Sequence, residues 1–215
     1  MTGPRLDWQA WHSAYDSDTS LRRRLEIVQR HIGEVLDTFK GSPLRVVSMC
    51  AGEARDLLGA LDERERHDIT GLLVELDPEL AGRARAHADA LGLSDLEVHV
   101  GDAGMTASYA GAVPGDLVLV CGVFGNISDA DIERTLRALP MLCAPGTTVI
   151  WTRHRREPDM TVNIRRWLTD SGFENIAYDP VPDSDTLGTV GVAVYRGATA
   201  PFVDQQLFTF IREKL

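Results

Sequence analysis

The stretch "VVSMCAGEARD", residues 46–56, decides the fold. An apolar run stops at the small residues Cys50, Ala51 and Gly52, and a polar, helix-compatible run follows. This change is typical of a strand that breaks into a tight ligand-binding turn ahead of a helix. Such turns usually carry two or three glycines, whereas this one has only Gly52. We therefore expect the backbone of this turn to approach a ligand closely. The residues at the ends of the following strands indicate what that ligand is.

Short apolar runs alternate with helical patterns from this stretch onward. The alternation predicts an α/β fold: a doubly wound, Rossmann-like, mostly parallel sheet with helices on both faces. The expected strands span residues 44–49, 70–76, 96–100, 116–121, 147–152 and 173–178. Four helices are expected. The first begins near Leu57, and the second begins after the Asp77-Pro78 cap and ends at Gly92. The third runs from Ser128 to a stop at Pro145-Gly146, and the fourth spans residues 161–171.

Two further strand-like pieces follow, at residues 190–195 and 207–211. Neither comes after a clear helix, so one of them is expected to close the sheet as an antiparallel last strand. The pattern does not choose firmly between them, and we favour 207–211 because it is the last element.

Residues 1–40 are expected to form an N-terminal helical cap on a ligand-binding domain of residues 41–215. The segment "LRRRLEIVQRHIGEVLDTF" is amphipathic, with Leu21, Leu25, Val28, Ile32, Val35 and Leu36 on one face. Two arrangements stay open: this face covers the monomer, or it pairs with a second copy in a homodimer.

The composition excludes some classes of protein. The chain is 44% hydrophobic and 25% charged, with a formal net charge of −10, which argues against nucleic acid as the main partner. No apolar run approaches the ~18 residues of a membrane span, and the N-terminus lacks a signal-peptide core. The three cysteines form no CxxC pair. We expect a cytoplasmic protein without a membrane partner.

Acidic residues end two of the expected strands. Glu75 follows Gly52 by 23 residues, near the spacing of about 20 for a carboxylate that accepts hydrogen bonds from ribose hydroxyls. Asp102 follows the third strand, where a carboxylate could accept from an exocyclic amine. Either residue alone is more often a helix cap or a solvated loop residue. Their order at successive strand ends favours a nucleoside-binding site.

Four motifs resemble those of the class I S-adenosylmethionine-dependent methyltransferases: "VVSMCAGEARDLL", "VELDPE", "HVGDAG" and "GDLVLVCGVFGN". The resemblance covers residue 44 to the C-terminus. It implies S-adenosylmethionine as cofactor, with Gly52 at the methionine moiety, Glu75 at the ribose, and Asp102 with Ala103 at the adenine. The other implied cofactor-binding residues are Tyr15, Cys50, Ala51, Glu53, Leu76, Cys121 and Gly122. Tyr15-Asp16 is similar to a pair found in cap helices of small-molecule methyltransferases.

The first motif departs from the family pattern at three positions. Ser48 stands where an acidic residue is usual, and Cys50 and Ala54 stand where glycines are usual. Ala54 is a modest change if its backbone angles are ordinary and a costly one if φ is positive. The missing glycines disfavour a dinucleotide more than a sulfonium cofactor, because a pyrophosphate needs close backbone approach.

His154 and His12 are the candidate catalytic residues. A base helps methyl transfer if the nucleophile is a hydroxyl or a protonated amine, and His154 follows the fifth strand at the expected ligand edge. His31, His67 and His87 fall on predicted helical surfaces or loops, and His99 lies within a strand. No cluster of His, Cys and Asp has metal-ligand spacing.

The acceptor is expected to be a small molecule. The fourth loop ends at Asn126 without the Pro-Pro-aromatic signature of methylation on bases and glutamine amides. Arg153, Arg155 and Arg156 would suit an anionic acceptor that carries a carboxylate or phosphate. Two alternatives stay open, a non-catalytic binding protein and a nicotinamide-dependent oxidoreductase. The short-chain form of the latter is disfavoured, because Lys40 and Lys214 are the only lysines.

Overall fold

A computed structural model describes residues 19–39, 41–62, 64, 66–182 and 187–211. Its seven strands form one sheet in the order β3-β2-β1-β4-β5-β7-β6. The strands are β1 (Leu44–Met49), β2 (Ile69–Glu75), β3 (Leu96–Val100), β4 (Gly115–Val120), β5 (Cys143–His154), β6 (Phe173–Pro180) and β7 (Gly188–Tyr195). The pairs among β1 to β5 are parallel, whereas β7 runs antiparallel to both β5 and β6. The predicted doubly wound sheet with a reversed last strand is confirmed.

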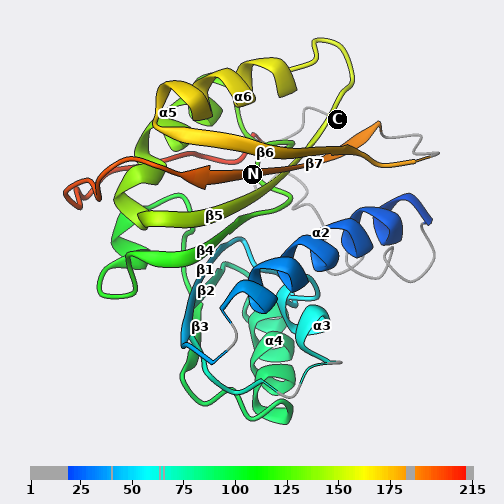
Figure 1. Cartoon of the computed structure of the whole chain (residues 1–215), viewed down its shortest axis with the longest axis vertical. Coiled ribbons are helices and arrows are strands. Elements are labelled where there is room, and N and C mark those ends of the chain that lie inside the picture. The colour runs from blue at the N-terminus through cyan, green and yellow to red at the C-terminus, as the bar shows by residue number, and fades with distance from the viewer. Residues whose placement is uncertain (1–18, 40, 63, 65, 183–186, 212–215) are drawn as a thin grey trace, which may run out of the picture.

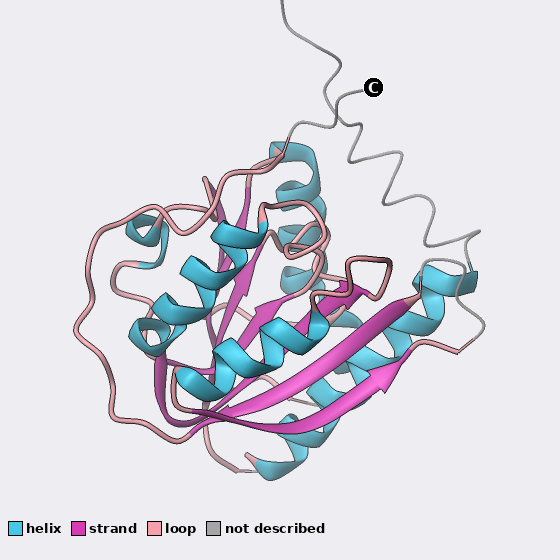
Figure 2. Cartoon of the chain, turned by 90° about the horizontal axis from the view of Figure 1, so that it is seen from above, coloured by secondary structure: helices cyan, strands magenta, loops and turns pink. Residues whose placement is uncertain are grey.

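Helices cover both faces of this sheet (Figures 1 and 2). One face carries α2 (Thr19–Thr38), α3 (Leu57–Leu61) and α4 (Pro78–Ala90), and the other carries α5 (Asp129–Ala138) and α6 (Thr161–Asp170). Two short 3₁₀ helices, η2 (Thr106–Tyr109) and η3 (Leu139–Leu142), lie in the connections. Because consecutive side chains of a strand alternate between faces, the buried strands feed two separate apolar cores.

The amphipathic N-terminal helix packs within the monomer. Val28, Ile32 and Leu36 of α2 are at most 2% exposed and join the core formed by α3, α4 and the sheet. The apolar face of α2 is therefore covered inside one chain, and a homodimer would have to use another surface. A domain boundary at residue 40 remains a prediction.

The preference for residues 207–211 as the closing strand is wrong. The reversed strand is β7, which inserts between β5 and β6. Every residue of β7 is buried, and its backbone pairs with β5 on one side and with β6 on the other, as in a central strand. Residues 204–211 instead cross the loops that follow β3 and β4, through single bridges from Gln206 to Met105 and from Phe210 to Ile127. We refer to residues 204–211 as the C-terminal strap.

The predicted end of α5 is also wrong. The helix begins as expected, with Ser128 Oγ accepting from Asp131 N, but it ends at Ala138. Pro140 has no N–H to continue the helical bonding, and the chain tightens into η3. Pro145 and Gly146 therefore lie inside the long strand β5. The Asp77-Pro78 start of α4 is confirmed, as is its termination before Gly92, whose φ is +71°.

Candidate functional site

The loop after β1 follows a left-handed path despite its missing glycines. Cys50, Gly52 and Ala54 have φ values of +53°, +59° and +54°. The sequence left open whether Ala54 is a modest or a costly departure from glycine. Its positive φ makes it costly, since a side chain in the left-handed region strains the backbone. Gln29 of α2 supports the loop, because its Nε2 donates to the carbonyl of Arg55 over 2.8 Å. The loop keeps its shape through tertiary contacts rather than through glycine content.

Glu75 joins this loop to the one after β2. Its Oε2 accepts from the backbone N–H of Gly52 over 2.7 Å, and its Oε1 accepts from that of Asp77 over 2.8 Å. Glu75 is only 8% exposed, so water competes little for these two charge-assisted hydrogen bonds. Each carboxylate oxygen keeps a second lone pair for a ligand hydroxyl.

The amides of the first loop are already used inside the protein. Ala51 N donates to Val74 O, Gly52 N donates to Glu75, and Ala54 N donates to Ala51 O. A pyrophosphate would find few free donors here, and it would meet the carboxylate of Glu75. The arrangement disfavours a dinucleotide and suits an uncharged or cationic ligand.

The loop after β3 is held in a compact turn. Asp102 Oδ1 accepts from Gly104 N over 2.8 Å, and its carbonyl accepts from Met105 N and Ser108 Oγ. The hydroxyl of the buried Tyr109 donates to the carbonyl of Ala103. Across the edge, the side chain of Leu76 is 61% exposed directly after β2. The ends of β2 and β3 thus present an exposed apolar side chain, Leu76, and a carboxylate, Asp102.

The three loops converge on Cys50. Burial raises the pKa of its thiol well above the ordinary value, and the nearby carboxylates of Glu75 and Asp102 raise it further. Burial, Cys50 and Asp102 likewise raise the pKa of Tyr109. The thiol is therefore protonated at neutral pH and is unsuited to act as a nucleophile.

The loop after β4 is fixed from β5. Thr152 Oγ1 accepts from Gly122 N over 2.8 Å, while an Nη of Arg153 donates to the carbonyl of Phe124. Asn126 closes the turn by donating to the carbonyl of Gly122. No atom would lie within 4 Å of a Cβ placed on Gly122, so the backbone there faces open space. Cys121, just before it, is half-buried, and its Sγ lies 3.9 Å from the carbonyl of Ile150.

Comparison with known proteins identifies the family. Residues 19–174 match the protein family described as "Putative methyltransferase". This chain belongs to that family. The match spans strands β1 to β5, every loop described above and the first residues of β6. The predicted kinship with the class I methyltransferases is confirmed.

Solved structures share the fold of this methyltransferase at low sequence identity. The magnesium protoporphyrin IX methyltransferase of Synechocystis, with bound SAM, is 14% identical over 90% of this chain and 100% of its own, with a TM-score of 0.63. The N-methyltransferase NodS of Bradyrhizobium japonicum is 15% identical over 85% and 99%, with a TM-score of 0.61. An RNA methyltransferase of Salinibacter ruber, with S-adenosyl-L-homocysteine, is 16% identical over 82% and 97%, with a TM-score of 0.51. No curated protein shows significant sequence similarity to the chain.

His154 lies at the end of β5, opposite Gly188 of β7. Burial lowers its pKa, the positive charges of Arg153 and Arg156 lower it further, and Asp159 opposes them. Its imidazole is neutral at pH 7 as a result, which is the state that accepts a proton. Its Nδ1 is buried without a hydrogen-bond partner.

Some sequence-predicted residues lie outside the described part of the chain, and others have a different place from the one expected. His12 and Tyr15 lie outside the described residues. Glu53 pairs with Arg55 and Arg83, so its carboxylate helps to shape the loop. His31 is buried, contrary to its predicted surface position, because its ring nitrogens face Glu34 and Asp179.

No pattern in the sequence indicates the role of the C-terminal strap. Leu207 N donates to Gly104 O over 2.7 Å, and Ile211 N donates to Asn126 O over 2.8 Å. The strap thus joins the loops after β3 and β4, the two outer strands of the group β3-β2-β1-β4. Thr152, which holds Gly122, was also missed, because a threonine inside a strand usually signals only strand propensity.

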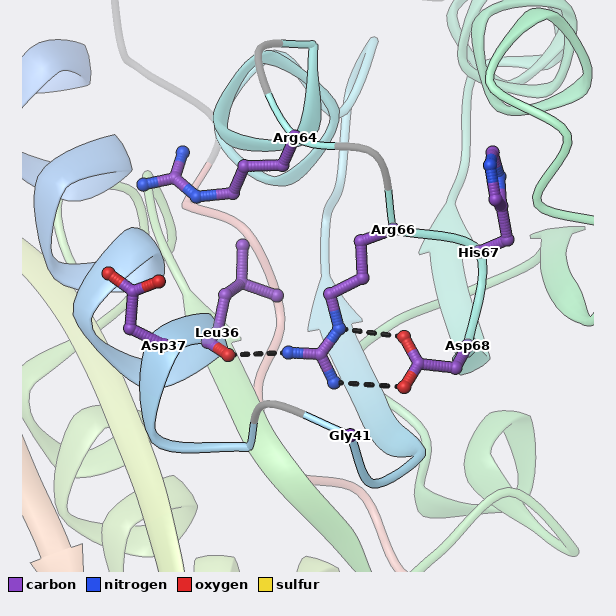
Figure 3. A pocket seen from close by; sticks show the side chains of 7 residues that line it. All are labelled: Leu36, Asp37, Gly41, Arg64, Arg66, His67 and Asp68. Carbon is purple, nitrogen blue, oxygen red and sulfur yellow. Dashed lines mark hydrogen bonds and ion pairs between the residues drawn. The ribbon is translucent and has the colours of Figure 1, made fainter.

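A hollow of about 660 Å³ lies elsewhere, between the end of α2 and the start of β2 (Figure 3). Arg66 organises it by donating to the carbonyls of Leu36, Phe39 and Ser42 and pairing with Asp68. These contacts satisfy the carbonyls at the end of α2, so the cluster has a structural role. A second hollow, of about 620 Å³, includes Arg45, Glu97 and His99 and is bordered by Ser108 in the connection that follows β3.

Within the part of the chain that the structure describes, no group of three or more His, Cys, Asp or Glu residues is placed to hold a metal ion. None of the described helices has the length and apolar character needed to cross a membrane.

Proposed function

We propose that this methyltransferase binds S-adenosylmethionine across the carboxyl ends of β1 to β4 and methylates a small anionic molecule. The observation that carries the proposal is the double hydrogen bond of Glu75 to Gly52 N and Asp77 N. One buried carboxylate thereby joins two strand-end loops, and the ends of parallel strands are where sheets of this kind bind nucleotides, which supports the proposal.

The residues at this edge fit each part of the cofactor. Glu75 would accept from the ribose hydroxyls, and Leu76, Asp102 and Ala103 would surround the adenine. The open backbone at Gly122 leaves room beside Cys121, where the methionine moiety would pass on its way to Gly52. Cys50, Ala51 and Glu53 complete the lining of the first loop, and Tyr15 is proposed as a contact from residues 1–18.

The cofactor would supply a methyl group already activated by a sulfonium. The protein then has to align the acceptor with it and exclude water. His154, which is neutral at pH 7, is proposed to take the proton of the acceptor nucleophile. His12 is a second candidate for this role.

Charge favours a small acceptor over nucleic acid. The net charge of −10 opposes a polyanion that covers much of the surface. A small anion needs only the local arginines after β5. The three cysteines are free, which agrees with the proposed cytoplasmic location.

The proposal is tested with methyl-labelled S-adenosylmethionine and a cell extract separated into a low-mass filtrate and a macromolecular fraction. We expect enzyme-dependent label in the filtrate. Label in RNA would contradict the small-molecule acceptor. Binding of S-adenosylhomocysteine with no label in either fraction would favour the non-catalytic alternative.

A further inference from the structure

Among the described residues, the buried side-chain polar atoms without partners gather at one place, the junction of β5 and β7. They are Trp151 Nε1, Arg153 Nε, His154 Nδ1, Arg155 Nε and Thr189 Oγ1. The great majority of buried polar atoms in folded proteins have a hydrogen-bond partner, since leaving one unpaired costs free energy. Four of the five belong to residues 151–155 and the fifth to Thr189 on the neighbouring strand, which indicates that something outside the described protein atoms completes their bonding.

Three of these residues share one face of the sheet. Trp151 is opposite Gly191 and Arg153 is opposite Thr189, two steps along the same antiparallel pair. Trp151 belongs to the core beneath α5 and α6, so Arg153 and Thr189 lie on that face also. Trp151 and Thr189 are 1% and 0% exposed. His154 lies on the opposite face.

The three groups offer hydrogen-bond donors on the same face of the β5–β7 pair. An indole N–H and a guanidinium Nε–H are donors only, and a threonine hydroxyl can donate. The group that satisfies all three is an oxygen with several lone pairs. Arg153 adds one positive charge, and its Nη donates to the carbonyl of Phe124 while its Nε is buried without a partner among the described residues.

The surrounding charges favour a monoanion. Asp129 and Asp159 both lie near enough to Arg153 to oppose the lowering of its pKa by burial. Asp159 is itself engaged by the N–H and hydroxyl of Thr161, at 2.9 Å and 2.7 Å. A doubly charged phosphate would be repelled by these carboxylates more than a carboxylate would.

The cluster adjoins the methyl-transfer edge. Arg153 holds the loop after β4 through Phe124, and the rings of Phe124 and Trp151 lie 6.3 Å apart. A Cβ on Gly191 would lie 2.2 Å from the Trp151 ring, so only glycine lets the indole rest against β7. A group bound here would lie beside the loop after β4, which also contains the open backbone at Gly122.

We propose that Trp151 Nε1, Arg153 and Thr189 Oγ1 form a subsite for a carboxylate group, and that the methyl acceptor is a small monocarboxylate. This inference rests on the function proposed above. It narrows the acceptor from any small anion to one chemical class.

The test follows the indole N–H signals of ¹⁵N-labelled full-length protein in the presence of S-adenosylhomocysteine. Benzoate is the probe, benzamide is its neutral counterpart, and inorganic phosphate distinguishes a general oxyanion site. The Trp151→Phe variant assigns the Trp151 signal, and Trp167 serves as an internal reference. We expect benzoate to shift the Trp151 signal downfield and to leave Trp167 in place, with no effect of benzamide.

Variants sharpen the result. Arg153→Gln should weaken benzoate binding about 10- to 100-fold, the loss expected for a charge-assisted hydrogen bond. Thr189→Val, which keeps the side-chain shape, should also weaken it, whereas Arg166→Gln on the exposed side of α6 should not. If these atoms only hold a buried water, benzoate will leave Trp151 unshifted at concentrations up to about 20 mM, far above a millimolar Kd.

The two proposals fail in different ways. Binding of S-adenosylhomocysteine without any response of Trp151 to benzoate would overturn the subsite and leave the methyltransferase function standing. A larger response to phosphate than to benzoate would overturn the monocarboxylate assignment. Failure to bind S-adenosylhomocysteine would overturn the function on which the subsite rests.

Discussion

The backbone N–H of Gly52 donates to Oε2 of Glu75 over 2.7 Å, and so one buried carboxylate joins the loops after β1 and β2. The same side chain accepts from Asp77 N at the start of α4. Residues 23 positions apart in sequence are therefore held together at the carboxyl edge of the sheet. The shape of the first loop and the identity of Glu75 depend on each other.

The strained first loop gives a prediction about Ala54. Ala54→Gly should change the free energy of unfolding by less than about 1 kcal/mol, because relief of left-handed strain offsets the lost methyl burial and the added chain entropy. Ala54→Val should cost more than about 2 kcal/mol, since a branched side chain at φ +54° is both strained and overpacked. Urea unfolding of both variants measures the difference. Equal effects of glycine and valine would contradict the left-handed path.

The C-terminal strap should support the site through Phe208. This ring is 1% exposed and contacts Phe210 edge-on at 5.7 Å, so Phe208→Ala should destabilise the protein by about 3–5 kcal/mol. Loosening the loops after β3 and β4 should also weaken S-adenosylhomocysteine binding. The control is Phe202→Ala, whose ring is 40% exposed and whose loss should cost less than about 1 kcal/mol. Comparable losses in the two variants would mean that residues 204–211 do not brace the site.

The docking of α2 on β6 should depend on acid. Burial raises the pKa of Asp179, but hydrogen bonds from His31 and Arg30 outweigh it and hold that pKa below its ordinary value. A carboxylate with a lowered folded pKa contributes stability above its unfolded pKa of about 3.9, and that contribution is lost as pH falls through the folded pKa.

Asp179→Asn should therefore destabilise the protein at pH 7 by about 1 kcal/mol, a modest value because Asp179 is partly exposed and screened. The difference from the wild type should shrink below about pH 4. Thermal unfolding from pH 3 to pH 7 checks this. A deficit that is constant across the range would show that the charge of Asp179 is not involved.

His154 should affect turnover rather than cofactor binding. His154→Ala is expected to lower kcat by about 10²- to 10⁴-fold, the usual contribution of a general base, with S-adenosylhomocysteine affinity unchanged. Because its pKa is lowered, the wild-type rate should persist to a lower pH than an ordinary histidine would allow before it falls. His67→Ala, on an exposed loop, is the matched control. Full activity of His154→Ala would remove this residue from the mechanism.

The sheet was predicted well from the sequence because buried parallel strands are continuously apolar. The helices between them were found because helix caps are local sequence signals. Asp77, Pro78 and Gly92 marked α4 correctly for that reason. The closing strand was misplaced because 190–195 and 207–211 are equally apolar, and only pairing with β5 and β6 distinguishes them. The first segment is buried throughout inside the sheet, whereas the second crosses the sheet's edge and buries Leu207 and Phe208.

The candidate site was predicted only in part. Spacing located Glu75, but no local pattern shows that its carboxylate would bind Gly52 N. Tertiary contacts impose the left-handed angles at Cys50 and Ala54. Cysteine and alanine normally avoid these angles, so the residue types do not reveal them. The partnerless atoms of Trp151 and Thr189 arise from strand register, which the sequence does not specify.

The most direct test of the central claim is calorimetric titration of the full chain with S-adenosylhomocysteine, for the wild type and Glu75→Ala. We predict micromolar binding by the wild type and at least about tenfold weaker binding by the variant, with folding confirmed by circular dichroism. Glu97→Gln, exposed on the neighbouring strand β3, should bind as the wild type does. No binding by the wild type at millimolar ligand, or equal affinity in the folded Glu75→Ala variant, would contradict the account.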